Sequence, residues 1–271
     1  MTERVHTGEA AARSASDQPG RVCIVIPAYD EAAMIGDILR RCRAALASAC
    51  IIVVDDGSRD NTGGIAARSG ATVLRHAKNQ GKGASLIDGM HIALAQQATC
   101  VVTLDGDGQH RPEDLPRLLA CGQSWPRRVV IGSRRASGRA APRARFIANR
   151  VADFWVSWAA RHPIDDSQSG FRVYPADLLR VITARSVLAR GFAFDSEILI
   201  EAARLGFLTA AVDIATIYGS QLRRPSHFRP VADITRIVLM VACKLLARGM
   251  DPIGLWQSLT LPRVRDTSHP R

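Results

Sequence analysis

The residue types that can do chemistry gather in one stretch of the chain, Cys100–His110, whose sequence is Cys-Val-Val-Thr-Leu-Asp-Gly-Asp-Gly-Gln-His. Its first five residues are rich in β-branched and apolar types, which is typical of a strand buried inside a parallel sheet. Asp105 and Asp107 follow, and two carboxylates this close repel each other unless a cation lies between them. Hard oxygen ligands favour Mg²⁺ or Mn²⁺, and Mg²⁺ usually also binds substrate phosphates. The stretch therefore predicts a metal and phosphate site, to which Gln109 could add a carbonyl oxygen.

Two other interpretations of this stretch have to be weighed. An isolated Asp-x-Asp is more often an ordinary polar turn after a strand than a metal site. A calcium loop of the helix–loop–helix kind is excluded, because its sixth position would be His110 rather than glycine and its twelfth Pro116 rather than glutamate. The metal hypothesis therefore depends on what the rest of the chain places beside these carboxylates.

Several apolar strands alternate with helical segments in the first half of the chain. We expect strands at 21–26, 51–54, 71–74, 100–104 and 129–132. Strands that are apolar throughout, with helices between them, predict an α/β fold with a mostly parallel central sheet covered by helices. In such sheets ligands bind beyond the carboxyl ends of the strands. Those ends carry the polar segments Pro27–Glu31, Asp55–Gly57, Asp105–Asp107 and Gly132–Arg134, so a crevice with a site is expected there.

The second half predicts a flexible Arg-rich loop from residue 136 that leads into an amphipathic helix, then a tight polar turn at Asp165–Arg172. Helices are expected at about 176–184 and 194–205, and a strand at about 207–215. We divide the chain into a disordered N-terminal lead-in (1–20), a catalytic domain (21–228), a C-terminal amphipathic helix (229–249) and a tail (250–271).

The charge of the chain limits the class of partner. The 271 residues carry a net charge of +11, and nearly all of the positive charge is arginine, which binds phosphate through two hydrogen bonds. This balance is compatible with nucleic acid, an anionic membrane surface or a phosphorylated substrate. We see no basic patch interleaved with aromatic residues and no zinc-finger or RNP-type motif, so we predict no nucleic-acid partner.

The same composition suggests a cellular location. None of the six cysteines forms a C-x-x-C pair, residues 1–20 lack the apolar core of a signal peptide, and the longest apolar candidate, Ile237–Cys243, is too short to span a bilayer. We therefore expect a cytoplasmic protein, peripheral on the cytoplasmic face of the membrane. The helix at 229–248 could lie on that surface or pack against the catalytic domain.

Together, the motifs resemble those of the family 2 inverting glycosyltransferases, and in particular the dolichyl- and polyprenyl-phosphate hexose (mannose or glucose) synthases. The resemblance runs from about residue 21 to 245 and implies a Rossmann-like nucleotide-sugar-binding fold of the GT-A type with a bound divalent metal. The segments that carry it are Val25–Glu31, Val54–Ser58, Asn79–Gly83, Asp105–His110, Gly132–Arg134, Asp166–Arg172 and Ser226–Asp233.

The resemblance also implies roles for single residues. Asp105, Asp107 and Gln109 would hold the metal, Mg²⁺ or Mn²⁺. Arg134 would meet phosphate at the reaction centre, with Arg145 as its partner from the flexible loop in competition with Arg143 and Arg150. Asp166 would lie near the acceptor. The residues expected to bind the nucleotide sugar are Pro27, Tyr29, Glu31, Val54, Asp56, Lys82, Asp105, Gly106 and Asp107.

The expected function is transfer of a hexose from a nucleotide sugar, of the UDP-glucose or GDP-mannose type, to a polyprenyl or dolichyl phosphate or a similar lipid-phosphate acceptor. The eukaryotic mannose synthases carry basic residues where this chain has Thr216 and His227, so the donor stays open. One alternative keeps the donor but uses a hydroxyl acceptor, on a lipid-linked glycan or an aryl-polyene-type product, with Asp166 as the base. The other is a nucleotide-sugar-binding domain without turnover. A P-loop kinase is excluded because G-x-x-x-x-G-K-[ST] is missing.

Overall fold

The computed structural model describes residues 20–135, 143–183, 193–215, 230–247 and 249–266, without the side chains of 143–145, 230–234 and 236. Within these ranges the strands form one eight-stranded sheet in the order β3-β2-β1-β4-β6-β5-β7-β8, in which β6 alone runs antiparallel to its neighbours. The strands are β1 (Val22–Ala28), β2 (Cys50–Asp55), β3 (Thr72–Arg75), β4 (Cys100–Thr103), β5 (Arg128–Ser133), β6 (Arg172–Pro175), β7 (Leu208–Asp213) and β8 (Arg265–Asp266).

Both faces of the sheet are covered, which explains why its central strands are apolar throughout. Along β1 and β2, Val25 and Val54 belong to one hydrophobic cluster, while Ile24 and Val53 belong to the cluster on the opposite face. This alternation follows from the two-residue period of a strand. The five strands expected in the first half of the sequence are therefore present, and the mostly parallel, helix-covered sheet is confirmed.

The helices of the first half connect successive parallel strands. They are α1 (Ile35–Ala45), α2 (Thr62–Arg68), α3 (Lys82–Ala95) and α4 (Leu115–Ser124), the last preceded by the short 3₁₀ helix η1 (Pro112–Asp114). Helix α1 buries Ile35, Ile38, Leu39 and Cys42, the spacing of one helical face. Helix α3 lies tightly against the sheet, since a Cβ on Gly89 would lie only 2.4 Å from a methyl carbon of Val25.

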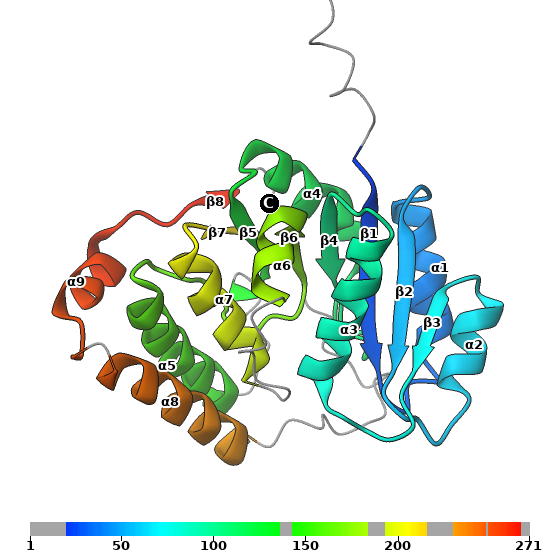
Figure 1. The fold of residues 1–271 in the computed structure, drawn as a ribbon, viewed down its shortest axis with the longest axis horizontal. Helices are drawn as coiled ribbons and strands as arrows, with labels where there is room; N and C mark the ends of the chain where they lie inside the picture. The colour runs from blue at the N-terminus through cyan, green and yellow to red at the C-terminus, as the bar shows by residue number, and fades with distance from the viewer. Residues whose placement is uncertain (1–19, 136–142, 184–192, 216–229, 248, 267–271) are drawn as a thin grey trace, which may run out of the picture.

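Most helices of the second half gather at the other end of the sheet, whereas the helix that follows β6 lies nearer the middle, beside α3 (Figure 1). The helices of the second half are α5 (Arg143–Ala160), α6 (Ala176–Thr183), α7 (Phe194–Arg204), α8 (Pro230–Leu246) and α9 (Pro252–Thr260). Helix α5 packs against α7, α8 and α9. None of the helices in the described part of the chain combines the length and apolar character that a bilayer-spanning segment requires.

The segment from residue 250, expected as a tail, is part of the folded unit. Asp251 caps α9, because its side chain accepts a hydrogen bond from the Gly254 amide at 3.0 Å. Its carbonyl oxygen accepts a hydrogen bond from Trp158 Nε1 at 3.0 Å, which ties α9 to α5. Strand β8 then pairs in parallel with β7. The Asp-Pro pair at 251–252 is a local helix-start pattern, whereas the edge strand depends on a distant partner. The predicted lead-in falls almost wholly outside the described residues.

Candidate active site

The polar segments predicted to meet do so at one edge of the sheet. In the parallel register of β1 and β2, Ala28 lies beside Asp55, and the Asp56 amide donates to the Ala28 carbonyl at 2.9 Å. Strand β4 ends beside β1, where the Leu104 amide donates to the Val25 carbonyl at 3.1 Å. The carboxyl ends of three neighbouring strands therefore open onto a common site.

The loop before α3 is fixed by a buried carboxylate. The two oxygens of Asp56 accept hydrogen bonds from the backbone amides of Gln80 and Gly81, each at 2.8 Å. His76 Nδ1 lies 2.7 Å from the same carboxylate, and its Nε2 lies 3.1 Å from Asp88. Asp56 thus fastens the Asn79–Gly83 motif to the end of β2. Its predicted nucleotide contact stays a prediction.

The turn after β4 separates its side chains into two sets. Asp105, Asp107 and Gln109 are partly exposed, whereas the alternating residues Gly106, Gly108 and His110 are buried. The Gln109 amide donates to Asp107 Oδ1 at 3.0 Å, which closes the turn. The three predicted metal ligands are therefore the partly exposed side chains of this turn.

Asp105 already has cationic partners within the protein. Lys82 Nζ, at the start of α3, lies 2.8 Å from Asp105 Oδ1 and 2.9 Å from Asp195 Oδ2. His110 Nε2 lies 3.4 Å from Asp105 Oδ2. Burial alone would raise the pKa of the Asp105 carboxyl, but the Lys82 ammonium and the His110 ring hold it well below its usual range. Asp105 is therefore ionised and fixed in position.

Asp107 lies in a different electrostatic environment. Burial and the neighbouring charge of Asp105 raise the pKa of its carboxyl. A cation bound between the two carboxylates would remove this penalty, and their hard oxygens suit Mg²⁺ or Mn²⁺. No three His, Cys, Asp or Glu side chains within the described ranges are grouped to hold a metal by themselves. The residues present therefore fit a metal that completes its coordination with Gln109 and substrate phosphate oxygens.

The second half of the site is built around an arginine and an aspartate. Arg134, just after β5, donates from Nε to Asp166 Oδ2 at 2.8 Å and from Nη2 to Asp166 Oδ1 at 2.7 Å. The Arg134 amide also donates to Oδ2, at 2.9 Å. Burial would raise the pKa of the Asp166 carboxyl, but Arg134 lowers it below its ordinary value. Asp166 has a left-handed φ of +52°, so this pairing holds an unfavourable backbone conformation.

Behind this pair lies a layer of further ion pairs. Asp165 accepts hydrogen bonds from Arg135 Nη1 at 2.5 Å and from Arg265 Nε of β8 at 2.7 Å. Arg135 also donates to Asp153 of α5 at 3.2 Å, and the other oxygen of Asp153 accepts from the Ser167 amide at 2.7 Å. Strand β8 and helix α5 therefore both support the turn that carries Asp166.

The turn at 165–171 also reaches the turn that carries Asp105 directly. A Cβ on Gly170 would lie 2.4 Å from Asp105 Oδ2, so this position has room for glycine alone. Arg172 of β6 is fully buried and donates to the carbonyls of Ser167 at 2.8 Å and Asp195 at 2.7 Å. Because Asp195 also holds Lys82, one chain of polar contacts joins the two halves of the site.

The structure places the remaining predicted residues as follows. Pro27, Tyr29 and Glu31 are partly exposed at the end of β1. The Val54 side chain is fully buried in the core, in register with Pro27 of β1 and Leu74 of β3, and its contact with a nucleotide stays a prediction. Gly106 packs against β1, since a Cβ there would lie 3.0 Å from the Pro27 carbonyl oxygen. The side chain of Arg145 lies outside the described residues, as do Thr216 and His227.

Sequence reasoning missed several members of the site. Asp195 holds Lys82 from the first turn of α7, far along the chain, and no spacing links the two. Arg135 follows the predicted Arg134, and Asp165 precedes the predicted Asp166. Their charge and position next to predicted site residues could have indicated them. His110 was noted within its motif but was not assigned a role.

Comparison with known proteins agrees with this geometry. The glycosyl transferase family 2 model matches residues 23–169. The chain is 32% identical over 210 residues to the undecaprenyl-phosphate mannosyltransferase of Micrococcus luteus, covering 73% of this chain and 84% of that protein. It is 30% identical over 203 residues to the polyprenol monophosphomannose synthase of Mycolicibacterium smegmatis, covering 72% and 76%.

Solved structures share the fold at lower identity. Mannosyl-3-phosphoglycerate synthase from Rubrobacter xylanophilus superposes with a TM-score of 0.66 at 21% identity, over 93% of this chain and 79% of that one. Glucosyl-3-phosphoglycerate synthase from Mycobacterium tuberculosis, in a complex that contains Mn²⁺ and UDP-glucose, gives 0.61 at 23% identity, over 86% and 81%. The chain therefore has a GT-A-type fold, belongs to glycosyl transferase family 2 and is a glycosyltransferase.

Proposed function

We propose that this glycosyltransferase moves a hexose, with inversion, from a nucleotide sugar to a polyprenyl phosphate, with Mg²⁺ or Mn²⁺ bound at Asp105 and Asp107. Two relatives support this proposal: an undecaprenyl-phosphate mannosyltransferase at 32% identity and a polyprenol monophosphomannose synthase at 30% identity. The observation that carries the proposal is the pairing of Arg134 with both oxygens of Asp166.

The donor end supports departure of a nucleoside diphosphate. Asp105 and Asp107, with Gln109, would hold the metal, which when bound offsets the negative charge that grows on the diphosphate. Lys82 begins α3 and lies 2.8 Å from Asp105, so its ammonium would lie beside the same phosphates. The amide-rich Asn79–Gly83 loop is held by Asp56 and lines this end. UDP-glucose and GDP-mannose are both candidate donors.

The acceptor end favours an acceptor that is already an anion. A hydroxyl acceptor would require a base, but Arg134 lowers the pKa of Asp166 and engages both of its oxygens, which makes Asp166 a weak base. A lipid phosphate needs no proton removed at neutral pH. It would instead be oriented by charge-assisted hydrogen bonds from an arginine. In this proposal Arg134 meets the phosphate and Asp166 is a positioning residue that sets the direction of the guanidinium.

A transfer assay with matched acceptors tests the proposal. The protein is incubated with Mn²⁺ and either UDP-glucose or GDP-mannose, and with a short polyprenyl phosphate or the corresponding polyprenol. We expect nucleoside diphosphate release that requires both the metal and the phosphorylated lipid, for one of the two donors. Transfer to the polyprenol instead would establish the hydroxyl alternative with Asp166 as base. Metal-dependent nucleotide binding without release under any acceptor would favour a binding domain without turnover.

A further inference from the structure

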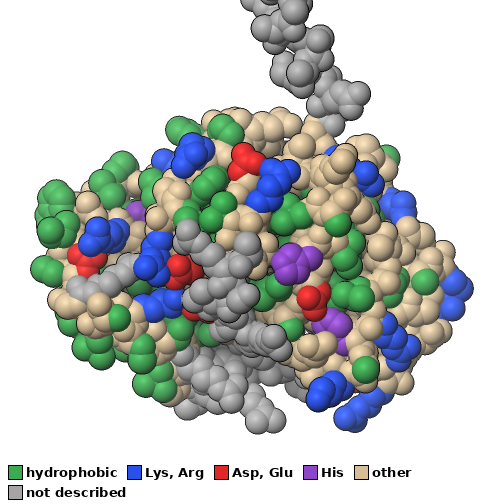
Figure 2. Space-filling model, in the orientation of Figure 1, with side chains coloured by type: hydrophobic (Ala, Val, Ile, Leu, Met, Phe, Trp, Pro, Cys, Tyr) green, Lys and Arg blue, Asp and Glu red, His purple; other side chains and the backbone are tan. Residues whose placement is uncertain are grey.

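Exposed apolar side chains concentrate on one part of the surface. Most of the large apolar side chains exposed in the described residues lie on α5, α8 and α9 or at their ends. Helix α5 packs against both α8 and α9, and Figure 2 shows hydrophobic side chains along the left side of the molecule, where Figure 1 places these three helices. We call this the α5–α8–α9 face. A contiguous apolar surface of this kind usually marks contact with a membrane or another protein.

Helix α9 forms the most exposed part of this face. Ile253, Trp256 and Leu259 follow one another at three-residue spacing and are 63%, 64% and 67% exposed. The helix contains no charged residue. Of the two alternatives for α8, a membrane surface or packing against the catalytic domain, the burial of Ile237 and Val241 favours the second for its apolar stripe. The surface contact is therefore carried by α9 and α5 more than by the apolar stripe of α8.

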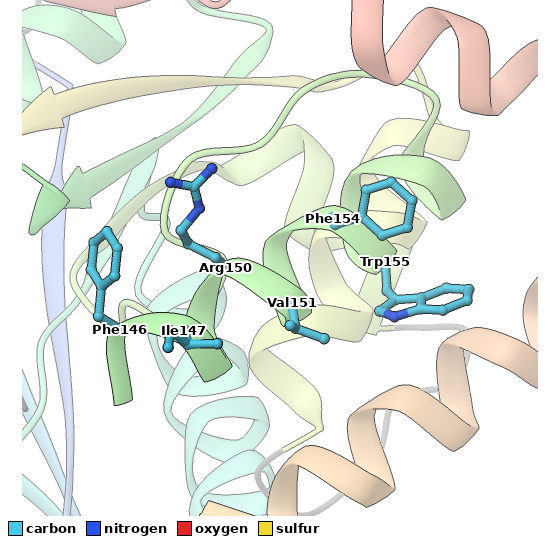
Figure 3. Close-up of a pocket in the computed structure, with 6 residues that line it drawn as sticks. All are labelled: Phe146, Ile147, Arg150, Val151, Phe154 and Trp155. Atoms are coloured by element: carbon cyan, nitrogen blue, oxygen red, sulfur yellow. The ribbon is translucent and has the colours of Figure 1, made fainter. Parts of the chain in front are cut away.

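Helix α5 adds an open apolar groove beside it. The groove has a volume of about 520 Å³ and is lined by the side chains of Phe146, Ile147, Arg150, Val151, Phe154 and Trp155, all from this one helix (Figure 3). Four of these apolar side chains are exposed large hydrophobic groups. Arg150 places a guanidinium within this otherwise apolar surface.

The charges around the face select its partner. Basic side chains flank it: Arg150 is exposed on α5, while Arg161, after α5, and Arg263, after α9, are each about half exposed and pair with the buried carboxylates of Asp251 and Asp165. Asp153 and Asp251, the acidic side chains described on or next to α5 and α9, are buried and bonded inward. An apolar surface with a basic rim and an exposed tryptophan suits the interface of an anionic bilayer. We propose that the α5–α8–α9 face docks on an anionic lipid surface, with α9 lying in the interface.

The face is joined to the active site through one helix. Phe154 projects to the surface, while the preceding Asp153 is buried and accepts a hydrogen bond from the Ser167 amide, beside Asp166. Docking would therefore hold the Arg134–Asp166 pair close to the lipid headgroups. This last step rests on the proposed polyprenyl phosphate acceptor, whereas the docking itself does not.

Vesicle binding by the full chain tests the docking without donor or acceptor. The vesicles contain phosphatidylcholine alone or phosphatidylcholine with phosphatidylglycerol, and bound protein is measured by co-sedimentation. We expect binding to the anionic vesicles that weakens as salt rises. The triple variant Ile253→Ser/Trp256→Ser/Leu259→Ser should reduce the partition coefficient by about 100-fold or more, because three apolar side chains no longer leave water.

Trp125→Ser is the matched control, since Trp125 is 45% exposed but lies at the end of α4, away from this face. It should leave binding unchanged. Circular dichroism and melting confirm that the variants fold, and Trp256→Ser alone replaces the triple variant if that one does not. Unchanged binding by the α9 variants, or equal binding to both kinds of vesicle, overturns the proposal. The proposal is also overturned if the wild type binds no vesicles but self-associates, and the triple variant is monomeric.

A transfer assay on a short, water-soluble polyprenyl phosphate separates this proposal from the proposed function. The α9 variants should keep full transfer to the soluble acceptor and lose transfer to acceptor embedded in anionic vesicles. Vesicle binding without any transfer would leave the docking standing and overturn the acceptor. Transfer to the soluble acceptor without vesicle binding would leave the proposed acceptor standing and overturn the docking.

Discussion

Asp107 and Asp166, at the proposed donor and acceptor ends of the site, lie in opposite electrostatic environments. At the acceptor end Asp166 is paired with Arg134 from the protein itself, and the pKa of its carboxyl is lowered. At the donor end burial and Asp105 raise the pKa of Asp107. The charge of Asp166 is therefore neutralised by the protein itself, whereas the charge of Asp107 would be neutralised by a bound cation. The comparison teaches that the two ends should respond differently when their charges are removed.

The largest effect is expected from Asp107→Ala. It should reduce turnover by about 1000-fold or more, because a metal ligand that stabilises the leaving group is lost. The melting temperature without metal should stay equal or rise, since the repulsion between Asp105 and Asp107 disappears. Nucleoside diphosphate release and thermal melting check both parts. Full activity in this variant would remove Asp107 from the metal site.

Arg134→Ala should lower turnover by about 100-fold to 1000-fold and also destabilise the fold, by about 3 kcal/mol or more, because Asp166 is left buried and unpaired. Nucleotide affinity, measured by calorimetry, should change little. The double variant Arg134→Ala/Asp166→Ala separates the two effects: it should regain much of the stability but none of the activity. If the double variant regained turnover, Arg134 would have a structural role only.

Asp166→Asn should have a smaller effect on transfer to polyprenyl phosphate, less than about tenfold, because a positioning residue is weakened but no base is lost. Asparagine keeps one oxygen for Arg134, so the pairing is partly retained. The rate as a function of pH should keep the same shape. A loss of several orders of magnitude would instead assign Asp166 as a base and reverse the assignment of the acceptor class.

The smallest effect is on the pH dependence of stability, to which two buried side chains, Asp153 and His162, contribute. Burial and the charge of Asp166 raise the pKa of Asp153 to about 6, so stability should fall as pH rises from about 4 to 6. Burial lowers the pKa of His162 to about 4, so its contribution to stability is lost as pH falls from about 6.5 to 4. The two slopes oppose each other, and the wild type should show little net dependence.

Single substitutions should expose these slopes. In Asp153→Asn only the titration of His162 remains, so the free energy of unfolding should rise by roughly 3 kcal/mol as the pH rises from about 4 to 6.5. In His162→Gln only the titration of Asp153 remains, so the free energy of unfolding should fall by a similar amount, roughly 3 kcal/mol, as the pH rises from about 4 to 6. Denaturant unfolding at pH 4, 5, 6 and 7 measures both. Parallel curves for the two variants would contradict the opposed shifts.

The parts of the molecule that the sequence predicts are those that local pattern determines. Strands β1 to β5 and helices such as α1 and α7 follow from apolar runs and helical periodicity. The family resemblance then supplied the fold type and the transferase activity, which the comparisons confirm. The individual roles of Asp105, Arg134 and the other site residues stay predictions.

Features that depend on distant partners were not predictable from local pattern. Strand β6 has four residues and follows a polar turn, so no alternation is long enough to reveal it. The packing of α9 on α5 and the pairing of β8 with β7 need contacts with Trp158 and Ala211. Likewise, Asp195 reaches Lys82 across 113 positions of sequence. Residue types and spacing carry no record of such pairs.

The antiparallel strand β6 also fixes the distance between strands β4 and β5. It lies between β4, which leads to Asp105, and β5, which leads to Arg134, with Arg172 beside Thr103 on one side and Ile131 on the other. Two strand spacings of about 4.8 Å each therefore separate the starting points of the turns that carry Asp105 and Arg134. Insertions in the surrounding loops would leave this separation unchanged, because the hydrogen-bonded strands fix it.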